Sequence, residues 1–428
     1  MRLHESWLGK ADTRSEHDDE GFGLYSIAIA DGSVAAVKPA SPASSKGRIA
    51  MPCPIDCHTH LDKGHIWPRA ANPDGSFTGA LETVEDDRRA QWSADDVEAR
   101  MEFALKCAYA YGTKAMRTHL DSLPPQETIS WPVFKTVRER WKGRIELQAA
   151  CLFGIDCARD EAWFDQLVDR VSEAGGVLGA VTYMVPDLIE LLDRVFRAAI
   201  DHGLDLDFHA DESHVLDDRS LHHIASAAMR HGYQGRILVG HCCSLALQPD
   251  DAVKATLDEV AAAGLSIVSL PMCNLYLQDR RHDGTTPRWR GVTLLHEMRA
   301  RGINTCVASD NTRDPFYAYG DLDMLEVYRM ATRTLHLDHP VAEWPNSILA
   351  NAADAMGLGD GYGRIGVGQP ADFLVFEGRN WTELLSRPES NRTLVRDGVV
   401  IQRTVPAYDE LDALMEVKND AEPRRAAE

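Results

Sequence analysis

The chain has 428 residues, of which 44% are hydrophobic, so it can build a sizeable core and global disorder is excluded. Its 45 Lys and Arg residues against 66 Asp and Glu residues give a formal net charge of −21. A surface of this sign argues against nucleic acid and anionic membranes as partners and stays compatible with a small neutral or cationic substrate.

The first 20 residues are polar and charged and lack the apolar core of a secretory signal. No stretch reaches the roughly 20 apolar residues of a membrane span. The nine cysteines are an odd number, and several lie inside apolar runs, which favours reduced thiols over a disulfide framework. We therefore expect a cytoplasmic protein.

The first predicted element is a β-hairpin. Residues 23–39 alternate apolar and polar side chains on both sides of Asp31-Gly32, a dipeptide typical of tight hairpin turns. We expect this hairpin to belong to a small sheet formed by residues 1–50.

Eight strands alternating with helices are predicted in the middle of the chain. Each strand is a short apolar or β-branched run that ends in a polar cluster, and a helical stretch such as 93–111, with Ser93 as its N-cap, follows. This order predicts a (β/α)₈ TIM barrel over residues 51–360, with the polar clusters gathered at one mouth. The predicted strands are 54–60, 113–121, 145–153, 177–184, 204–212, 236–243, 265–272 and 303–311.

The C-terminal flank is again typical of β-structure. Residues 363–403 contain the apolar runs ADFLVFEG and TLVRDGVVIQRT, with a second turn at Asp397-Gly398. We expect residues 361–415 to complete the small β-sheet domain begun by residues 1–50, and residues 416–428, which are charged, to form a frayed tail.

The stretch CPIDCHTHLDKGH, residues 53–65, places His58 and His60 two positions apart at the end of the first barrel strand. In an extended strand, residues i and i+2 point to the same face, so both imidazoles can reach one metal ion without distortion of the backbone. Taken alone, the pair could equally be two solvated histidines at a strand end.

Further strand ends supply the missing partners of this pair. His209 ends the fifth strand and Asp310 ends the eighth, so three imidazoles and one carboxylate face one mouth. Such a set suits a single divalent ion, Zn²⁺ or Fe²⁺, that lowers the pKa of bound water toward about 7. Glu212 and His241 remain for moving protons between water, substrate and leaving group. The fifth strand must turn after Asp211 to bring Glu212 to the mouth. The fourth strand has no lysine that could form a carbamate and bridge two metal ions, so a single ion is expected.

Together, the motifs HTHLDK, HADE, GHCC, ASDNTRDPF and GRIGVGQPADFLVF resemble the amidohydrolase superfamily, specifically its cytosine-deaminase-like branch, over roughly residues 50–400. The resemblance implies a barrel with a β domain, one zinc or iron ion, and hydrolysis at an sp² carbon that carries nitrogen. It implies that the metal ligands are His58, His60, His209 and Asp310. It also implies Glu212 as the proton shuttle and His241 as a polariser of the attacking water, and Asp310 is counted with these two as a catalytic group.

Two departures from cytosine deaminases concern the substrate. The glutamine that ends their third strand is absent near Phe153, and Asn311 and Phe316 stand where they carry an acidic residue and a tryptophan. The stretch SDNTRD is closer to the N-isopropylammelide amidohydrolases. Candidate substrate contacts are Phe153, Gln278, Asn311 and Phe316, and candidate residues behind the ligands are His119 and Asp121.

The sequence thus predicts a deaminase in which metal-bound hydroxide attacks a ring carbon of a cytosine-like heterocycle and ammonia is released. One alternative releases an alkylamine from an N-substituted triazine, and another opens a cyclic amide or lactone. A third, from a different class, is a non-catalytic metal- or small-molecule-binding barrel. The resemblance also favours a homo-oligomer.

Overall fold

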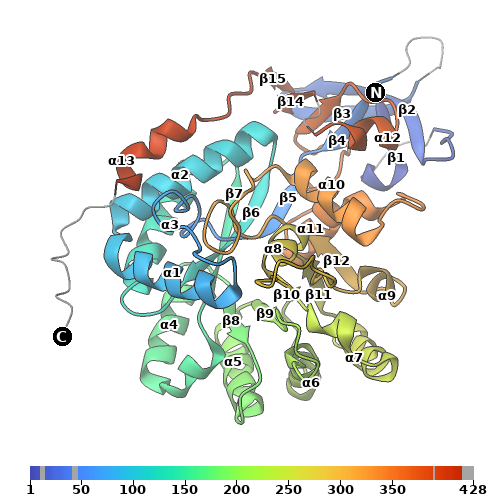
Figure 1. Cartoon of the computed structure of the whole chain (residues 1–428). Coiled ribbons are helices and arrows are strands. Elements are labelled where there is room, and N and C mark those ends of the chain that lie inside the picture. Colours follow the sequence, from blue (N-terminus) through green and yellow to red (C-terminus); the bar gives the residue numbers. More distant parts are fainter. Residues whose placement is uncertain (10–14, 41–46, 389–390, 417–428) are drawn as a thin grey trace.

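The computed structural model of the chain describes residues 1–9, 15–40, 47–388 and 391–416. Its centre is a ring of eight parallel strands surrounded by helices, and a smaller sheet lies at one side (Figure 1). The predicted barrel with a β-sheet formed from both flanks is confirmed. The barrel strands are β5 (Ile55–Thr59), β6 (Ala115–Asp121), β7 (Glu146–Leu152), β8 (Leu178–Thr182), β9 (Leu206–Ala210), β10 (Ile237–His241), β11 (Ser266–Ser269) and β12 (Asn304–Val307).

The barrel closes between its first and last strands. β5 to β7 form one parallel ladder and β8 to β12 another. Bridges from Ala150 to Val177 and from Gly154 to Val181 join β7 to the β8 segment. On the other side, Thr59 pairs with Asp310, and the Asp310 amide donates to the His58 carbonyl at 2.9 Å. Barrel closure therefore brings the two ends of the barrel sequence together.

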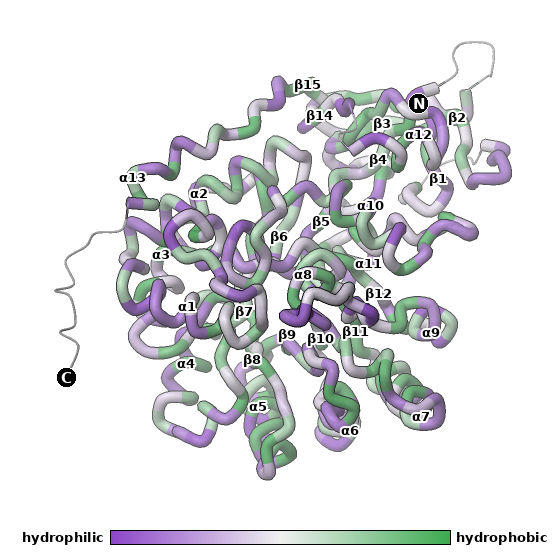
Figure 2. Tube along the Cα trace, viewed as in Figure 1, coloured by the Kyte–Doolittle hydropathy of each residue, from purple (hydrophilic) through white to green (hydrophobic). Residues whose placement is uncertain are grey.

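The helices form where the apolar residues recur at helical spacing. In α5 the buried side chains include Leu188, Leu192, Val195 and Ala199, which face the barrel along one stripe. α2 begins as predicted, because the Ser93 hydroxyl accepts the Asp96 amide. Figure 2 shows hydrophobic and hydrophilic segments alternating along outer helices such as α5 and α7. No helix of the described residues is long and apolar enough to cross a bilayer.

The helices have the following bounds: α1 Phe77–Gln91, α2 Ala94–Tyr111, α3 Glu127–Trp141, α4 Glu161–Glu173, α5 Leu188–His202, α6 Ser220–His231, α7 Asp250–Ala262, α8 Pro271–Leu277, α9 Leu295–Arg299, α10 Met324–Leu335, α11 Ala350–Ala355, α12 Trp381–Ser386 and α13 Asp412–Met415.

The small sheet joins the two flanks of the chain in the order β15-β14-β13-β4-β1-β2-β3. Its N-terminal strands include the predicted hairpin, and β13 pairs with β4 from Phe373–Pro52 to Phe376–Ile49. The exact domain boundaries stay a prediction. The predicted boundary at residue 50 falls inside strand β4. Of the predicted tail 416–428, all but residue 416 lies outside the described residues. The sheet strands are β1 (Arg2–His4), β2 (Phe22–Ala30), β3 (Ser33–Pro39), β4 (Ile49–Pro52), β13 (Phe373–Phe376), β14 (Arg392–Arg396) and β15 (Val399–Ile401).

Candidate metal centre and active site

The predicted pair on the first strand lies inside the barrel. His58 is on β5 and His60 directly follows it; both side chains are buried. Thr59 points the other way, and its hydroxyl donates to the Arg117 carbonyl at 3.0 Å. The alternation of an extended strand therefore places both imidazoles on the same side, as their spacing predicts.

The predicted ligands come together at one point. His60 Nε2 lies 3.1 Å from Asp310 Oδ1 and 3.3 Å from His209 Nε2, and His58 Nε2 lies 3.5 Å from the same Asp310 oxygen. A tetrahedral ion with ligand atoms about 2.0–2.1 Å away separates those atoms from one another by roughly 3.3 Å. These three contacts fit ligands of a transition-metal ion. Within the described residues, His58, His60 and His209 offer ligand atoms within 4.8 Å of one another, in a group that also includes His119, and Asp310 forms a second such group with His58 and His241.

The hydrogen bonding of this cluster supports the same interpretation. Both ring nitrogens of His58 and both carboxylate oxygens of Asp310 are buried without a hydrogen-bond partner. Buried polar atoms without partners are costly, and a divalent cation between them would satisfy the Asp310 carboxylate and one of the two His58 nitrogens. The donor set, imidazole nitrogen and carboxylate oxygen, suits zinc or ferrous iron.

Electrostatics keeps the imidazoles ready to bind a cation. Burial lowers the pKa of His58, His60 and His209 well below the usual value, so these rings are neutral near pH 7. Burial alone would raise the pKa of Asp310, but its contact with His60 holds that pKa below the usual value. One carboxylate and three neutral imidazoles therefore face the centre without competition from protons.

Three of the strand ends that form the site have a left-handed backbone. Asp211, His241 and Asp310 have φ values of 54°, 69° and 63°, in the left-handed region that non-glycine residues rarely adopt. Such strain is found where the surrounding structure fixes a functional geometry. At Asp211 it ends β9 and turns the chain, so that Glu212 reaches the mouth as predicted.

Glu212 and His241 lie side by side at the centre. His241 Nδ1 is 3.3 Å from Glu212 Oε1. Burial, together with the nearby Asp310 carboxylate, raises the pKa of Glu212 well above its usual range, so it can carry a proton near neutral pH. Burial lowers the pKa of His241 to about 4. The two groups therefore lie within reach of each other at the centre, with opposite shifts of pKa.

Sequence analysis missed Asn274, on the short helix α8. Its Nδ2 lies 3.2 Å from Glu212 Oε1 and 3.1 Å from His241 Nδ1. Nothing in the sequence marks this residue, because its position depends on the turn between β11 and α8.

His119 and Asp121, which were predicted to lie behind the ligands, occupy different parts of the site. The His119 ring packs against His58 with centroids 4.0 Å apart and the ring planes tilted by 40°, and its Nε2 lies 2.9 Å from the buried Asp207 carboxylate. This arrangement fits the predicted orienting role. Asp121 instead binds Lys63 at 2.6 Å and Arg88 at 2.9 Å, on the wall of a cavity.

That inner cavity, of about 310 Å³, opens directly above the metal ligands. Its walls include three of the predicted substrate contacts, Phe153, Asn311 and Phe316. Lys63 also lines it, with Nζ 5.6 Å from the centre of the Phe316 ring. Sequence analysis did not identify Lys63 as a site residue, although its place three positions after His60 in HTHLDK was a usable signal.

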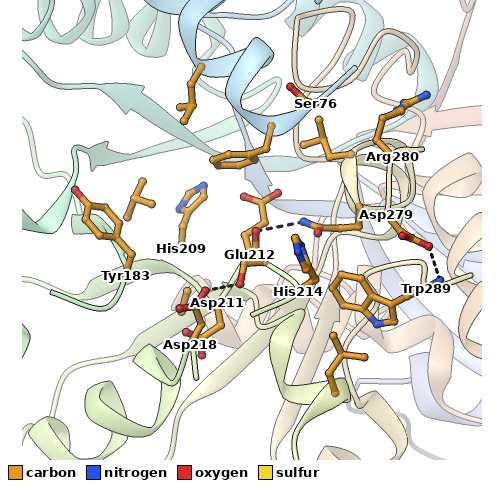
Figure 3. A pocket seen from close by; sticks show the side chains of 18 of the residues that line it. Ser76, Tyr183, His209, Asp211, Glu212, His214, Asp218, Asp279, Arg280 and Trp289 are labelled. Atoms are coloured by element: carbon orange, nitrogen blue, oxygen red, sulfur yellow. Dashed lines mark hydrogen bonds between the residues drawn. The ribbon is translucent and has the colours of Figure 1, made fainter. Parts of the chain in front are cut away.

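A larger outer cavity of about 1010 Å³ shares lining residues with the inner one, among them Phe77, Leu81 and Glu212. Figure 3 shows Glu212 at the centre of this space, with His209 on one side and Arg280 and Trp289 on the other. The predicted contact Gln278 lines the outer cavity, and its Nε2 donates to the Glu212 carbonyl at 3.2 Å. The site therefore has a narrow inner chamber and a wide entrance.

Comparisons with known proteins agree with this architecture. A model of the amidohydrolase family matches residues 142–405. A pterin deaminase of Rhizobium rhizogenes (strain K84) is 53% identical over 403 residues, which cover 92% of each chain. The crystal structure of 5-methylcytosine deaminase from Klebsiella pneumoniae, liganded with 5-fluorocytosine, has a TM-score of 0.80 at 23% identity and covers 94% of this chain and 98% of that one. N-isopropylammelide isopropylaminohydrolase from Burkholderia multivorans has a TM-score of 0.73 at 24% identity, with 89% and 95% covered.

Proposed function

Because this chain belongs to the amidohydrolase family and is a metal-dependent deaminase of a nitrogen heterocycle, we propose that its substrate is a pterin. The enzyme would replace the exocyclic amino group of the pyrimidine ring by oxygen and release ammonia. The observation that carries this proposal is the likeness to the Rhizobium pterin deaminase, which extends over nearly the whole of both chains.

The shape of the site supports a flat bicyclic substrate. Phe153 and Phe316 line the inner cavity, and Phe77 packs edge-on against Phe316 with ring centroids 5.7 Å apart. Aromatic walls of this kind favour a planar ring system. The wide outer cavity leaves room for substituents on the end of the substrate that faces away from the metal ligands.

The cations of the inner cavity support recognition of a ring carbonyl. Lys63 and Arg88 both bind the carboxylate of Asp121 at the wall. Burial alone would lower the pKa of Lys63, but the Asp121, Asp62 and Asp314 carboxylates hold that pKa above its usual value, so the ammonium group stays charged. We propose that Lys63 donates a hydrogen bond to the oxo group of the pterin. A charge-assisted hydrogen bond of this kind contributes about 1.5–3 kcal/mol.

The chemistry follows from the residues at the centre. His58, His60, His209 and Asp310 would hold one zinc or iron ion, which supplies Lewis acidity and lowers the pKa of water. Glu212 would take one proton of the attacking water to the ring nitrogen beside the reacting carbon, and would then carry the second proton, from the new hydroxyl, to the departing amino group. His241 would donate a hydrogen bond to the new oxygen. One C–O bond forms, one C–N bond breaks, and water and the aminoheterocycle become a lactam and ammonia.

We further propose that the enzyme is cytoplasmic and homo-oligomeric. The nine cysteines are free thiols, and eight of them are buried, which suits a reducing compartment. Val399 and Val400 on the edge strand β15 are 63% and 66% exposed, which suits contact with another copy.

Ammonia release from a panel of heterocycles tests the proposed substrate. Enzyme loaded with zinc or with iron is incubated with pterin, cytosine, 5-methylcytosine, guanine, isoguanine and an N-alkyl triazine, and products are identified by mass. We expect ammonia from pterin with the highest kcat/KM of the panel. Release of an alkylamine from the triazine as the preferred reaction would instead support the alternative to which the stretch SDNTRD points, and no turnover of pterin would overturn the proposal.

A further inference from the structure

We infer that Asn274 is a positioning residue, whose one side-chain amide fixes both the proton shuttle and the group that polarises the attacking water. The inference rests on the proposed function, because it assigns Glu212 and His241 those two roles. Asn274 Nδ2 lies 3.2 Å from Glu212 Oε1 and 3.1 Å from His241 Nδ1, and the two acceptors are themselves 3.3 Å apart.

The hydrogen-bond donors of Asn274 determine which nitrogen of the His241 ring carries the proton. The Asn274 amide nitrogen carries two hydrogens, one for the Glu212 carboxylate and one for the His241 ring. A ring nitrogen that accepts a hydrogen bond carries no proton, so the proton of neutral His241 must be on Nε2. This Nε2 is buried without a partner, and a ring nitrogen of His241 lies within 4.8 Å of ligand atoms of His58 and Asp310.

The fixed tautomer has two consequences for the centre. A protonated Nε2 can donate a hydrogen bond to the oxygen that attacks the substrate. The same proton prevents Nε2 from binding a metal ion, because a ligand nitrogen needs a free lone pair. Asn274 therefore keeps His241 as a hydrogen-bond donor beside the three histidine ligands and stops it from becoming a fourth.

The position of Asn274 is rigid. Only 1% of its surface is exposed, its amide donates to the Leu270 carbonyl at 3.0 Å, and its carbonyl accepts the Gln278 amide at 2.9 Å. Met272 and Leu277 of the same helix are buried in the core. A side chain on a packed helix holds its partners within narrower limits than a side chain on a loop.

A double-mutant cycle tests the inference. Asn274→Leu keeps the side-chain size but removes both donors. In the metal-loaded wild-type background, we expect kcat to fall roughly 10- to 100-fold, as for other groups that orient catalytic residues, with KM changed less than about threefold. In the Glu212→Gln background, the same change should cost at least about threefold less than in the wild type, because the shuttle is already lost and only the positioning of His241 remains to be removed. Equal losses in both backgrounds, or an unchanged kcat, would overturn the inference.

Readouts that do not depend on activity separate positioning from folding. Metal content and the thermal midpoint of Asn274→Leu should stay close to those of the wild type, whereas its crystal structure should show the Glu212 carboxylate and the His241 ring displaced. Asn274→Asp, which keeps the shape but cannot donate, should also lose kcat, so the test does not depend on one variant. Both groups in their wild-type positions in the Asn274→Leu crystal would contradict the inference.

A matched control is Asn351→Leu. Asn351 donates its side-chain amide to the Thr305 carbonyl on β12, away from the cavity, and should keep kcat within about twofold. The cycle is run on whichever heterocycle the wild-type enzyme deaminates. Failure of pterin as a substrate would therefore overturn the proposed function, whereas additive losses would overturn only the role of Asn274.

Discussion

His60 Nε2 and Asp310 Oδ1 lie 3.1 Å apart, although the two residues follow the first and the last strand of the barrel. The contact is possible because Thr59 and Asp310 form the bridge that closes the barrel. Ser309 strengthens the same closure, since its backbone amide donates to the buried Asp56 carboxylate at 3.1 Å. Assembly of the metal ligands and closure of the barrel are therefore one structural event.

Metal removal should lower both activity and stability. Four buried side chains converge on one point, so an ion there binds the folded chain and not the unfolded one, which stabilises the fold by about 4 kcal/mol when the ion is a thousandfold above its Kd. We expect a chelator to abolish turnover and lower the thermal midpoint, and one equivalent of zinc or iron to restore both. Elemental analysis and calorimetry measure this, and full activity in metal-free protein would contradict it.

Glu212→Gln should separate metal binding from catalysis. Glu212 is not among the predicted ligands, and its pKa is raised by burial and by Asp310, as a proton shuttle requires. We expect kcat to fall at least about a hundredfold, in line with general acid–base contributions, with the metal content unchanged. Steady-state kinetics and elemental analysis on the same sample decide this. A variant with wild-type turnover would remove Glu212 from the proton pathway.

The sequence was sufficient to predict the barrel and the proximity of the candidate ligands. Each strand is an apolar run that must be buried on both faces, and each ends in polar residues that this burial excludes from the core. His58, His60, His209 and Asp310 all occupy such ends, so the convergence of parallel strands at one mouth predicts their proximity. The small sheet was predictable because Asp31-Gly32 and Asp397-Gly398 are sequence-specific turns.

The parts of the site that sequence analysis missed depend on tertiary geometry. Lys63 becomes a cavity residue only because Asp121, on a different strand, binds its ammonium group. Asn274 reaches two partners from a helix of seven residues that starts after a bend. The sequence also left the identity of the substrate undetermined, because Phe153 and Phe316 indicate a flat ring but do not specify which ring.

Lys63→Met should weaken substrate recognition without loss of metal. The variant keeps the length of the side chain but removes the charge that we assign to the oxo group of the substrate. We expect kcat/KM for pterin to fall roughly 10- to 100-fold, which corresponds to about 1.5–3 kcal/mol for a charge-assisted hydrogen bond. Lys114, a half-buried lysine paired with Asp372 away from the cavity, provides the control Lys114→Met. Equal kcat/KM for the two variants would contradict a role of Lys63 in binding.

Arg69→Met should destabilise the fold and leave the chemistry intact. The Arg69 guanidinium binds Asp87 at 3.0 Å and Asp96 at 2.5 Å, and it also donates to the Leu414 carbonyl at 2.9 Å. Loss of one partner from a buried ionic network costs about 3–5 kcal/mol. Urea unfolding measures the change. Arg140→Met, which removes exposed ion pairs, should cost less than about 1 kcal/mol, and a similar cost for both variants would show that the Arg69 network contributes little.

Asp314 should make the stability of the fold depend on pH. Its carboxylate holds the loop after the eighth strand by accepting hydrogen bonds from the Asn311 side chain at 2.7 Å and the Phe316 amide at 2.8 Å. Burial raises the pKa of Asp314 to about 7, above its unfolded value of 3.8. The folded state therefore binds more protons than the unfolded state between these values, so this carboxyl group contributes stability at low pH and loses it as pH rises through 7, with a slope of at most about 1.4 kcal/mol per pH unit. Asp314→Asn keeps one of the two acceptor oxygens and cannot ionise. Its free energy of unfolding relative to the wild type should therefore improve from pH 5 to about pH 7 and change little from there to pH 8. Parallel urea titrations of both metal-loaded proteins measure this difference, and a difference that is constant over the whole range would show that Asp314 does not titrate there.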